Sequence, residues 1–375
     1  MLLKERAVSG APDTFYQDIF RLVMPIVLQN LLNTAVNSAD VVILGYVGQT
    51  ALSASSLANQ WQFILNLIYS GITSGMIMLV AQYWGKGDTR TIEKIMGIAT
   101  ALSALVSAAF AVLACFFPQI VMLFFTNDPE LIEAGSSYLR IIGVSYLFMS
   151  ISQVYLNTMR AIERVAFSTV VSGAALVINI GLNAVFIFGL FGAPKMGIVG
   201  VALATLIARV VETGACLADS LRFRTIQFRP SRIFRFERII FKDFIHYALP
   251  ALGNDIVWGV GFAMYSVIMG HLGSDIVAAN SVVVVVRNLG TAVCFGLASG
   301  GAILLGKEIG ENRVEDVKRH ASKLCWVTFA SGIAGGLIVL LVRALLPSIG
   351  NLTETANEYL RIMLLINGYY VLGQA

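Results

Sequence analysis

Ten long apolar runs, separated by shorter polar segments, make up most of the chain. A helix that crosses the hydrocarbon core of a bilayer needs about 20 apolar residues, and it satisfies its own backbone hydrogen bonds there. Every run but the last reaches that length, and the last is cut off at Ala375. The pattern predicts an all-α polytopic membrane protein with about ten spans, at approximately residues 19–44, 53–82, 95–118, 136–157, 165–191, 196–218, 244–269, 276–305, 324–346 and 359–373.

The polar segments between the runs alternate in basic charge. The segment after the second span carries Lys86, Arg90 and Lys94, whereas the segment 126–135 carries no base. The stretch 219–243 carries seven bases. Because basic loops stay on the cytoplasmic side, we expect a multi-pass protein of the cell (inner) membrane with a cytoplasmic N-terminus.

The composition supports this membrane interpretation and argues against other classes of protein. Of 375 residues, 57% are hydrophobic and 13% are charged, which is too little charge to cover a globular surface in water. The net charge of +4 follows the loop pattern, so we expect the stretch 219–243 to lie on anionic lipid headgroups rather than on nucleic acid. No paired acids, H-E-x-x-H motif or C-x-x-C spacing occurs. We therefore expect neither an enzyme nor a bound cofactor.

The two halves of the chain match each other when Pro25 is placed on Pro250. In this alignment, which we call the repeat register, Gly71, Gly75 and Gly85 fall on Gly296, Gly300 and Gly310. The basic loops also align, so both copies enter the membrane from the same side and form a parallel repeat. The repeat predicts an N-terminal lobe at 1–218, a basic cytoplasmic linker at 219–243 and a partial C-terminal lobe at 244–375. Because the first copy has six spans, the second is about two helices short.

Several ordered motifs resemble those of the multidrug and toxic compound extrusion (MATE) family. Pro25-x-x-x-Gln29 is followed by Asp40 and then by Gly45-x-x-Gly48. Later spans carry Asn179-x-x-x-Asn183 and Gly197-x-x-Gly200, with Thr205 after them. The resemblance implies two six-helix lobes, the second incomplete here, and export of small molecules in exchange for protons or sodium.

The resemblance also implies an ion site inside the first lobe. Position by position, the site comprises Asp40, Asn179, Asn183 and Thr205. Some members of the family carry an acid where Asn183 stands, so the amide slightly favours proton coupling through Asp40 over sodium. From the residues alone, Asp40 is either a functional acid at membrane depth or a hydrated acid at the interface. Asn179 and Asn183 share one helical face and either bind the ion or join helices.

A second group of candidates lies in the second half. Asp255 and Arg287 form either a structural ion pair or a second switch at which a proton or a cationic substrate competes for the acid. Trp258 and Tyr265 either line a cavity, where they could hold organic cations, or simply pack between helices. Gln29 is a further candidate in the first span.

The sequence therefore predicts a secondary antiporter that exports drugs or cationic, amphipathic organic compounds by alternating access. We expect a monomer within the lipid bilayer. Two alternatives remain at this point. One is a flippase for lipid-linked oligosaccharides, and the other is an inactive fragment or scaffold of a transporter.

Overall fold

The computed structural model describes residues 15–222, 226–228, 237–272, 274–345 and 354–374. Within these ranges it does not describe the side chains of residues 33–43, 45–47, 49, 263, 266, 267, 270–272, 274, 275, 277, 278, 281, 344, 345, 354, 356 and 374. The side chain of Asp40 therefore lies outside the described part, although its backbone belongs to the first helix.

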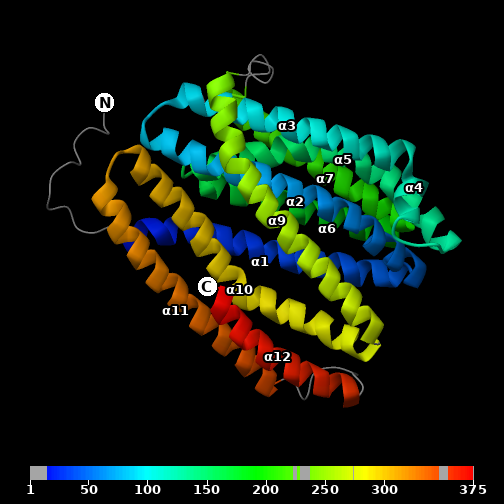
Figure 1. Ribbon diagram of the computed structural model, residues 1–375. Helices are drawn as coiled ribbons and strands as arrows, with labels where there is room; N and C mark the ends of the chain where they lie inside the picture. Colours follow the sequence, from blue (N-terminus) through cyan, green and yellow to red (C-terminus); the bar gives the residue numbers. More distant parts are fainter. Residues whose placement is uncertain (1–14, 223–225, 229–236, 273, 346–353, 375) are drawn as a thin grey trace.

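Long helices account for nearly all of the described backbone, and no strand occurs in the ranges given above (Figure 1). Each predicted span falls on one long helix, and the helices extend beyond the predicted ends by up to ten residues, as α11 does at Val314. The helices are α1 (Phe15–Val47), α2 (Gln49–Gly85), α3 (Thr89–Phe116), α4 (Pro118–Leu123), α5 (Pro129–Ala161), α6 (Val165–Phe188), the short 3₁₀ helix η1 (Leu190–Gly192), α7 (Gly197–Arg222), α9 (Arg238–Leu272), α10 (Ser274–Gly310), α11 (Val314–Leu345) and α12 (Glu354–Gln374).

Seven of the helices in the described part of the chain are long and apolar enough to cross a membrane. These are α2, α3, α5, α6, α7, α10 and α11. The other three long helices, α1, α9 and α12, contain residues whose side chains are not described. The prediction of an all-α polytopic membrane protein is confirmed, whereas the lobe boundaries stay predictions.

Local sequence signals explain where several helices start and stop. Asp88 caps α3 by accepting a hydrogen bond from the backbone N–H of Thr91, and the Thr91 hydroxyl also donates to it. These bonds hold the pKa of the Asp88 carboxyl below its usual range. The short helix α4 was not predicted, because Pro118 ends α3 and restarts a helix inside one apolar run.

The basic loops gather at one end of the helix bundle. The turn between α2 and α3 and the turn between α10 and α11 lie together on the left in Figure 1, with the start of α1 nearby. We call this the basic end. The turn between α1 and α2 and the turn between α9 and α10 lie at the opposite end, as does α4.

Three main pairs of helices join the first half (residues 15–222) to the second half (residues 237–374). Helix α2 packs along α9 and along α10, and α1 packs along α10. Glycines let the backbones approach. A Cβ on Gly75 would lie 2.6 Å from the Cα of Ala248, and one on Gly300 would lie 2.9 Å from Val23 Cγ2. The joint between the halves therefore depends on the absence of side chains at these glycines.

The repeat register also relates the two sides of the joint. Gly71 faces Leu252 and Gly75 faces Ala248, while the aligned Gly296 faces Val27 and Gly300 faces Val23. Closer to the basic end, Gly85 faces the Lys307 carbonyl and Gly310 faces the Gln82 carbonyl. Each contact has its counterpart with the roles of the two halves exchanged, as at a two-fold axis.

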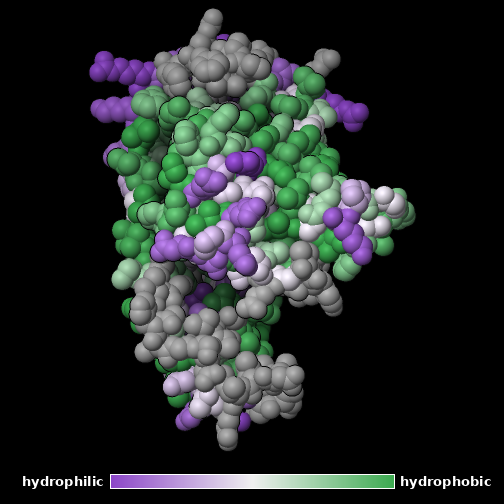
Figure 2. Space-filling model, turned by 90° about the vertical axis from the view of Figure 1, so that its right-hand side faces the viewer, coloured by the Kyte–Doolittle hydropathy of each residue, from purple (hydrophilic) through white to green (hydrophobic). Residues whose placement is uncertain are grey.

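The joint lies toward the basic end. There Lys307 Nζ lies 2.8 Å from both carboxylate oxygens of Glu163, which ties α10 to the turn after α5. The described contacts between the halves therefore gather toward the basic end. Figure 2 looks onto the opposite end and shows a hollow below the coloured residues of the first half.

The close approach at Gly75 predicts a cost for the smallest substitution. Gly75→Ala should lower the free energy of unfolding by about 1–3 kcal/mol, because its Cβ would meet the backbone of Ala248. Gly253→Ala is the matched control, since a Cβ there meets nothing within 4 Å and alanine favours the helix. Thermal unfolding in detergent would measure both. Equal stability of the two variants would contradict the described joint.

Candidate functional site

Three of the four predicted ion-site residues lie together inside the first half. Asn179 and Asn183 are buried on α6, and Thr205 faces them from α7. Asn183 Nδ2 donates to Asn179 Oδ1 at 3.3 Å, and Asn179 Nδ2 donates to Thr205 Oγ1 at 3.1 Å. The Thr205 hydroxyl donates in turn to the Val201 carbonyl at 3.0 Å. The three side chains therefore form one chain of hydrogen bonds between two helices.

The turn between α6 and α7 positions this cluster. Gly189 ends α6 in the left-handed conformation, with φ of 72°, and reverses the chain. The N–H of Met196 then donates to the Phe186 carbonyl at 2.9 Å. A Cβ on Gly200 would lie 2.7 Å from Phe186 Cβ, so glycine lets α7 pack closely on α6. This packing brings Thr205 within hydrogen-bonding distance of Asn179.

The fourth predicted residue, Asp40, lies on α1, which packs against α6. Its side chain is outside the described part of the chain, so its distance from the asparagines is not assigned. The cluster of Asn179, Asn183 and Thr205 offers amide and hydroxyl oxygens without a charge of its own. Such oxygens can ligate a hard cation or hydrogen-bond to a carboxylic acid.

Gln29 belongs to a different buried group. Arg160 donates to Gln29 Oε1 through Nη2, to Ser168 Oγ at 3.0 Å through Nε, and to Asn157 Oδ1 at 3.4 Å through Nη1. Arg160 lies in the last turn of α5, and its guanidinium is directed into the protein, where it joins α1, α5 and α6.

Sequence reasoning missed a buried acid in α7. The Glu212 side chain is 2% exposed, and its Oε2 accepts from Arg209 Nη1 at 2.7 Å and from Ser152 Oγ at 3.3 Å. About two helical turns beyond it, Asp219 accepts from Arg164 and from the Tyr155 hydroxyl, each at 2.8 Å. Glu212 is therefore a buried acid that the candidate residues of the sequence analysis do not include.

A positional signal for Glu212 was present in the sequence. It follows Thr205 by about two helical turns, so both lie on one face of α7. The inside of the first half therefore contains two polar layers. One holds Asn179, Asn183 and Thr205, and the other holds Arg209, Glu212 and Ser152.

The predicted residues of the second half form an aromatic group rather than an ion pair. The Arg287 guanidinium lies over the ring of Phe262 at 4.9 Å and over that of Tyr370 at 5.7 Å. Trp258 is 45% exposed, and its ring centroid lies 4.3 Å from that of Phe262. Among the described side chains, no ion pair joins Arg287 to Asp255.

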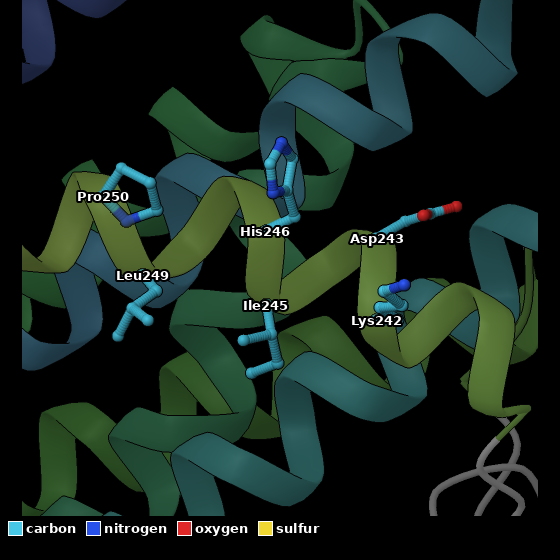
Figure 3. Close-up of a pocket in the computed structure, with 6 residues that line it drawn as sticks. All are labelled: Lys242, Asp243, Ile245, His246, Leu249 and Pro250. Atoms are coloured by element: carbon cyan, nitrogen blue, oxygen red, sulfur yellow. The ribbon is translucent and has the colours of Figure 1, made fainter.

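Tyr265 lies apart from the rings around Arg287 and donates to Asn280 Oδ1 at 3.4 Å. A separate groove lies on α9 at the basic end and is lined by residues of that helix alone (Figure 3). It contains none of the predicted site residues. Its lining residues are Lys242, Asp243, Ile245, His246, Leu249 and Pro250.

A model of one protein family matches the chain in two segments. The family is described as MatE, and the matched residues are 25–185 and 250–375. The segments begin at Pro25 and Pro250, the two prolines that define the repeat register. The chain belongs to the MatE family. The predicted family membership is confirmed.

Curated relatives of this MatE protein carry the names of drug-resistance proteins. "Probable multidrug resistance protein NorM" of Rhizobium meliloti is 26% identical over 82% of this chain and 66% of its own length. "Probable multidrug resistance protein YoeA" of Bacillus subtilis is 26% identical over 94% of this chain and 78% of its own length. The chain thus spans about two thirds of the first relative and somewhat more of the second.

Solved structures of MATE transporters share the fold. An outward-facing multidrug resistance MATE transporter superposes with a TM-score of 0.84 at 18% identity, over 96% of this chain and 79% of that one. A transporter of the MOP superfamily from Pyrococcus furiosus, described as having a binding pocket of reversed polarity, gives a TM-score of 0.83 at 20% identity over the same shares of the two chains. These likenesses show that the chain shares the all-α fold of these proteins.

The hydrogen bond between α6 and α7 predicts a specific effect on stability. Thr205→Val should lower the free energy of unfolding by about 1 kcal/mol, because the Asn179 amide loses its acceptor in a buried position. Thr100→Val is the matched control, since the buried Thr100 hydroxyl bonds only to the Met96 carbonyl of its own helix. Chemical unfolding in detergent compares them. An equal loss in both variants would show that the contact between the helices contributes nothing.

Proposed function

We propose that this MatE protein is a secondary antiporter that exports drugs or organic cations in exchange for protons or sodium. The observation that carries the proposal is the match of the MatE model to both halves of the chain, in the repeat register. The names of the relatives support drug export over the flippase alternative. The chain spans about two thirds of the first relative, so drug export has to be tested on this chain itself.

The arrangement of the halves supports alternating access. A carrier of this kind needs two halves that close at one end while a path is open at the other, and that can exchange these states. The joint at Gly75 and Gly300 and the ion pair of Lys307 with Glu163 close the basic end, while a hollow lies at the opposite end. Under the positive-inside rule the closed end faces the cytoplasm, so this is an outward-open arrangement.

The coupling ion is proposed to bind in the first half, at Asp40 with Asn179, Asn183 and Thr205. Asn179 Oδ1 and Thr205 Oγ1 each already accept a hydrogen bond inside the cluster. A sodium ion would have to compete with these bonds, whereas a proton on Asp40 needs only one nearby acceptor. This chemistry, together with the amide in place of an acid at position 183, favours the proton.

The aromatic group in the second half is proposed to line the path of the substrate. Trp258 offers an exposed ring, which suits an amphipathic organic cation. The Arg287 guanidinium, which lies over the ring of Phe262, repels a cation. We therefore place the cationic part of a substrate nearer to Asp255 and Trp258. We propose that the carrier acts as a monomer in the cell membrane.

Neutralising Asp40 tests the proposed coupling. In vesicles holding this chain, an imposed proton gradient should drive a fluorescent organic cation against its concentration, and Asp40→Asn should abolish that transport. Thermal unfolding should show that the variant remains folded. Asp243→Asn, which removes an exposed acid of α9, is the matched control and should transport normally.

Two further arms of this experiment separate the alternatives. Transport that is driven by a sodium gradient but not by a proton gradient would identify sodium, rather than the proton, as the coupling ion. No transport from folded protein, with transport restored when the chain is extended by the remaining C-terminal segment of a longer relative, would indicate an inactive fragment. Unfolding of Asp40→Asn would contradict the coupling role.

A further inference from the structure

The first turn of α1 docks on the second half at the basic end. There the ring of Phe15 stacks on the imidazole of His320, with centroids 4.7 Å apart and an angle of 29° between the rings. His320 Nδ1 lies 2.6 Å from Glu308 Oε1. Phe15, His320 and Glu308 are 3%, 7% and 2% exposed, so this contact between the halves contains a buried ionisable pair.

The internal repeat provides a comparison within the same molecule. In the repeat register, Phe15, Glu308 and His320 correspond to Ile240, Tyr83 and Ile95. These three counterparts belong to a single hydrophobic cluster, in which Ile95 is fully buried and Tyr83 and Ile240 pack against it. The related contact on the other side of the joint is therefore built from apolar and aromatic side chains without an ionisable pair.

This asymmetry calls for an explanation beyond packing. Burying an ionisable pair removes two groups from water, and apolar side chains of similar volume often stabilise a protein equally well or better. The counterpart contact shows that such side chains can hold this joint. A buried ionisable pair at a contact whose counterpart in the repeat is apolar is therefore a candidate for a functional site.

Two cationic side chains lie close to the contact of His320 with Glu308 and Phe15. Arg313 Nη2 lies 3.9 Å from Glu308 Oε1, but Arg313 also pairs with Glu311 and Asp316. Lys323 Nζ lies 5.6 Å from the centre of the Phe15 ring.

More distant charges surround this group on every helix that packs against it. On α1, Asp18 and Arg21 are exposed near Phe15. On α11, Arg319 pairs with Asp316, and at the end of α10 Lys307 pairs with Glu163. Among the described side chains of α12, the charged ones are Glu358 and Arg361, and they lie in its first turns toward the opposite end.

We propose that His320 is a proton-binding site that locks the two halves together at the basic end. Protonated His320 neutralises Glu308 in the buried contact and presents a cationic ring to the face of Phe15. When His320 is neutral, Arg313 is the cation nearest to the Glu308 carboxylate among the described side chains, and Glu308 shares it with Glu311 and Asp316. Opening the basic end separates Phe15 from His320 and exposes the pair to water. Acid therefore favours the closed contact, and a rise in pH favours opening.

The consequence for transport rests on the proposed antiport. If the basic end faces the cytoplasm, then an acidified cytoplasm holds the carrier closed on that side. Protons that enter through the exchange cycle would acidify the cytoplasm and thereby slow further exchange. The site binds its proton at the joint, away from the cluster of Asn179, Asn183 and Thr205, so the two proton effects are separable.

Distance measurements between two spin labels test the lock without any transport. Arg90 and Glu315 occupy repeat-equivalent, exposed positions in the first turns of α3 and α11, one in each half. Labels would be placed there after replacement of Cys115, Cys216, Cys294 and Cys325, and distances recorded in lipid nanodiscs. In the otherwise wild-type chain, the share of molecules with the shorter distance between the labels, which corresponds to the closed basic end, should rise as the pH falls.

Three variants identify the group that titrates. His320→Gln should remove the pH response. The double variant Glu308→Tyr with His320→Ile copies the apolar counterpart and should keep the short distance at every pH, which also shows that the joint still forms. His246→Gln alters an exposed histidine of the α9 groove and should respond like the wild type.

Three results would overturn the proposal. They are a wild-type distance that does not change with pH, a response that survives in His320→Gln, and a response that disappears in Asp40→Asn, which would place the proton at Asp40 instead. Because no gradient or substrate is used, the lock can be confirmed in a chain that fails to transport, and it can fail in one that transports.

Discussion

The close approach of backbones at the joint is the constraint on which the rest of this structure depends. Gly71 and Gly75 let α9 approach α2, and Gly296 and Gly300 let α1 approach α10. Larger residues at these positions would push the halves apart, and the ion pair of Lys307 with Glu163 and the stack of Phe15 on His320 would be lost with them. The closed basic end, the hollow at the other end and the proposed lock all follow from this contact.

The fold could be predicted well because its two strongest signals are properties of the sequence itself. Apolar length determines which segments cross the membrane, and the repeat register anticipates the reciprocal contacts of the glycines. The clustering of Asn179, Asn183 and Thr205 was also expected, although from the resemblance to a family rather than from spacing alone. The spacing shows only which residues share a helical face.

The direction of a side chain between helices could not be predicted in the same way. Arg160 lies at the end of a span, where a basic residue usually faces lipid headgroups, and the acceptors Gln29 and Ser168 that turn it inward lie on other helices. Arg287 was expected to pair with Asp255 because the two charges are opposite, but its guanidinium lies over the rings of Phe262 and Tyr370 instead. Glu212 could have been found from its position on the same face of α7 as Thr205.

The two prolines of the repeat lie within the joint. Val23 and Val27 flank Pro25 and contact Gly300 and Gly296, and Ala248 and Leu252 flank Pro250 in the same way. Pro25 therefore lies within the contact between the halves, and Asp40 lies about four turns farther along α1. With a rise of about 1.5 Å per residue this distance is about 22 Å, so a change of about ten degrees in the bend at the proline would move the backbone of residue 40 by about 4 Å. Because α6 packs along α1, such a change of angle at the joint would also shift the acid against the helix that carries Asn179 and Asn183.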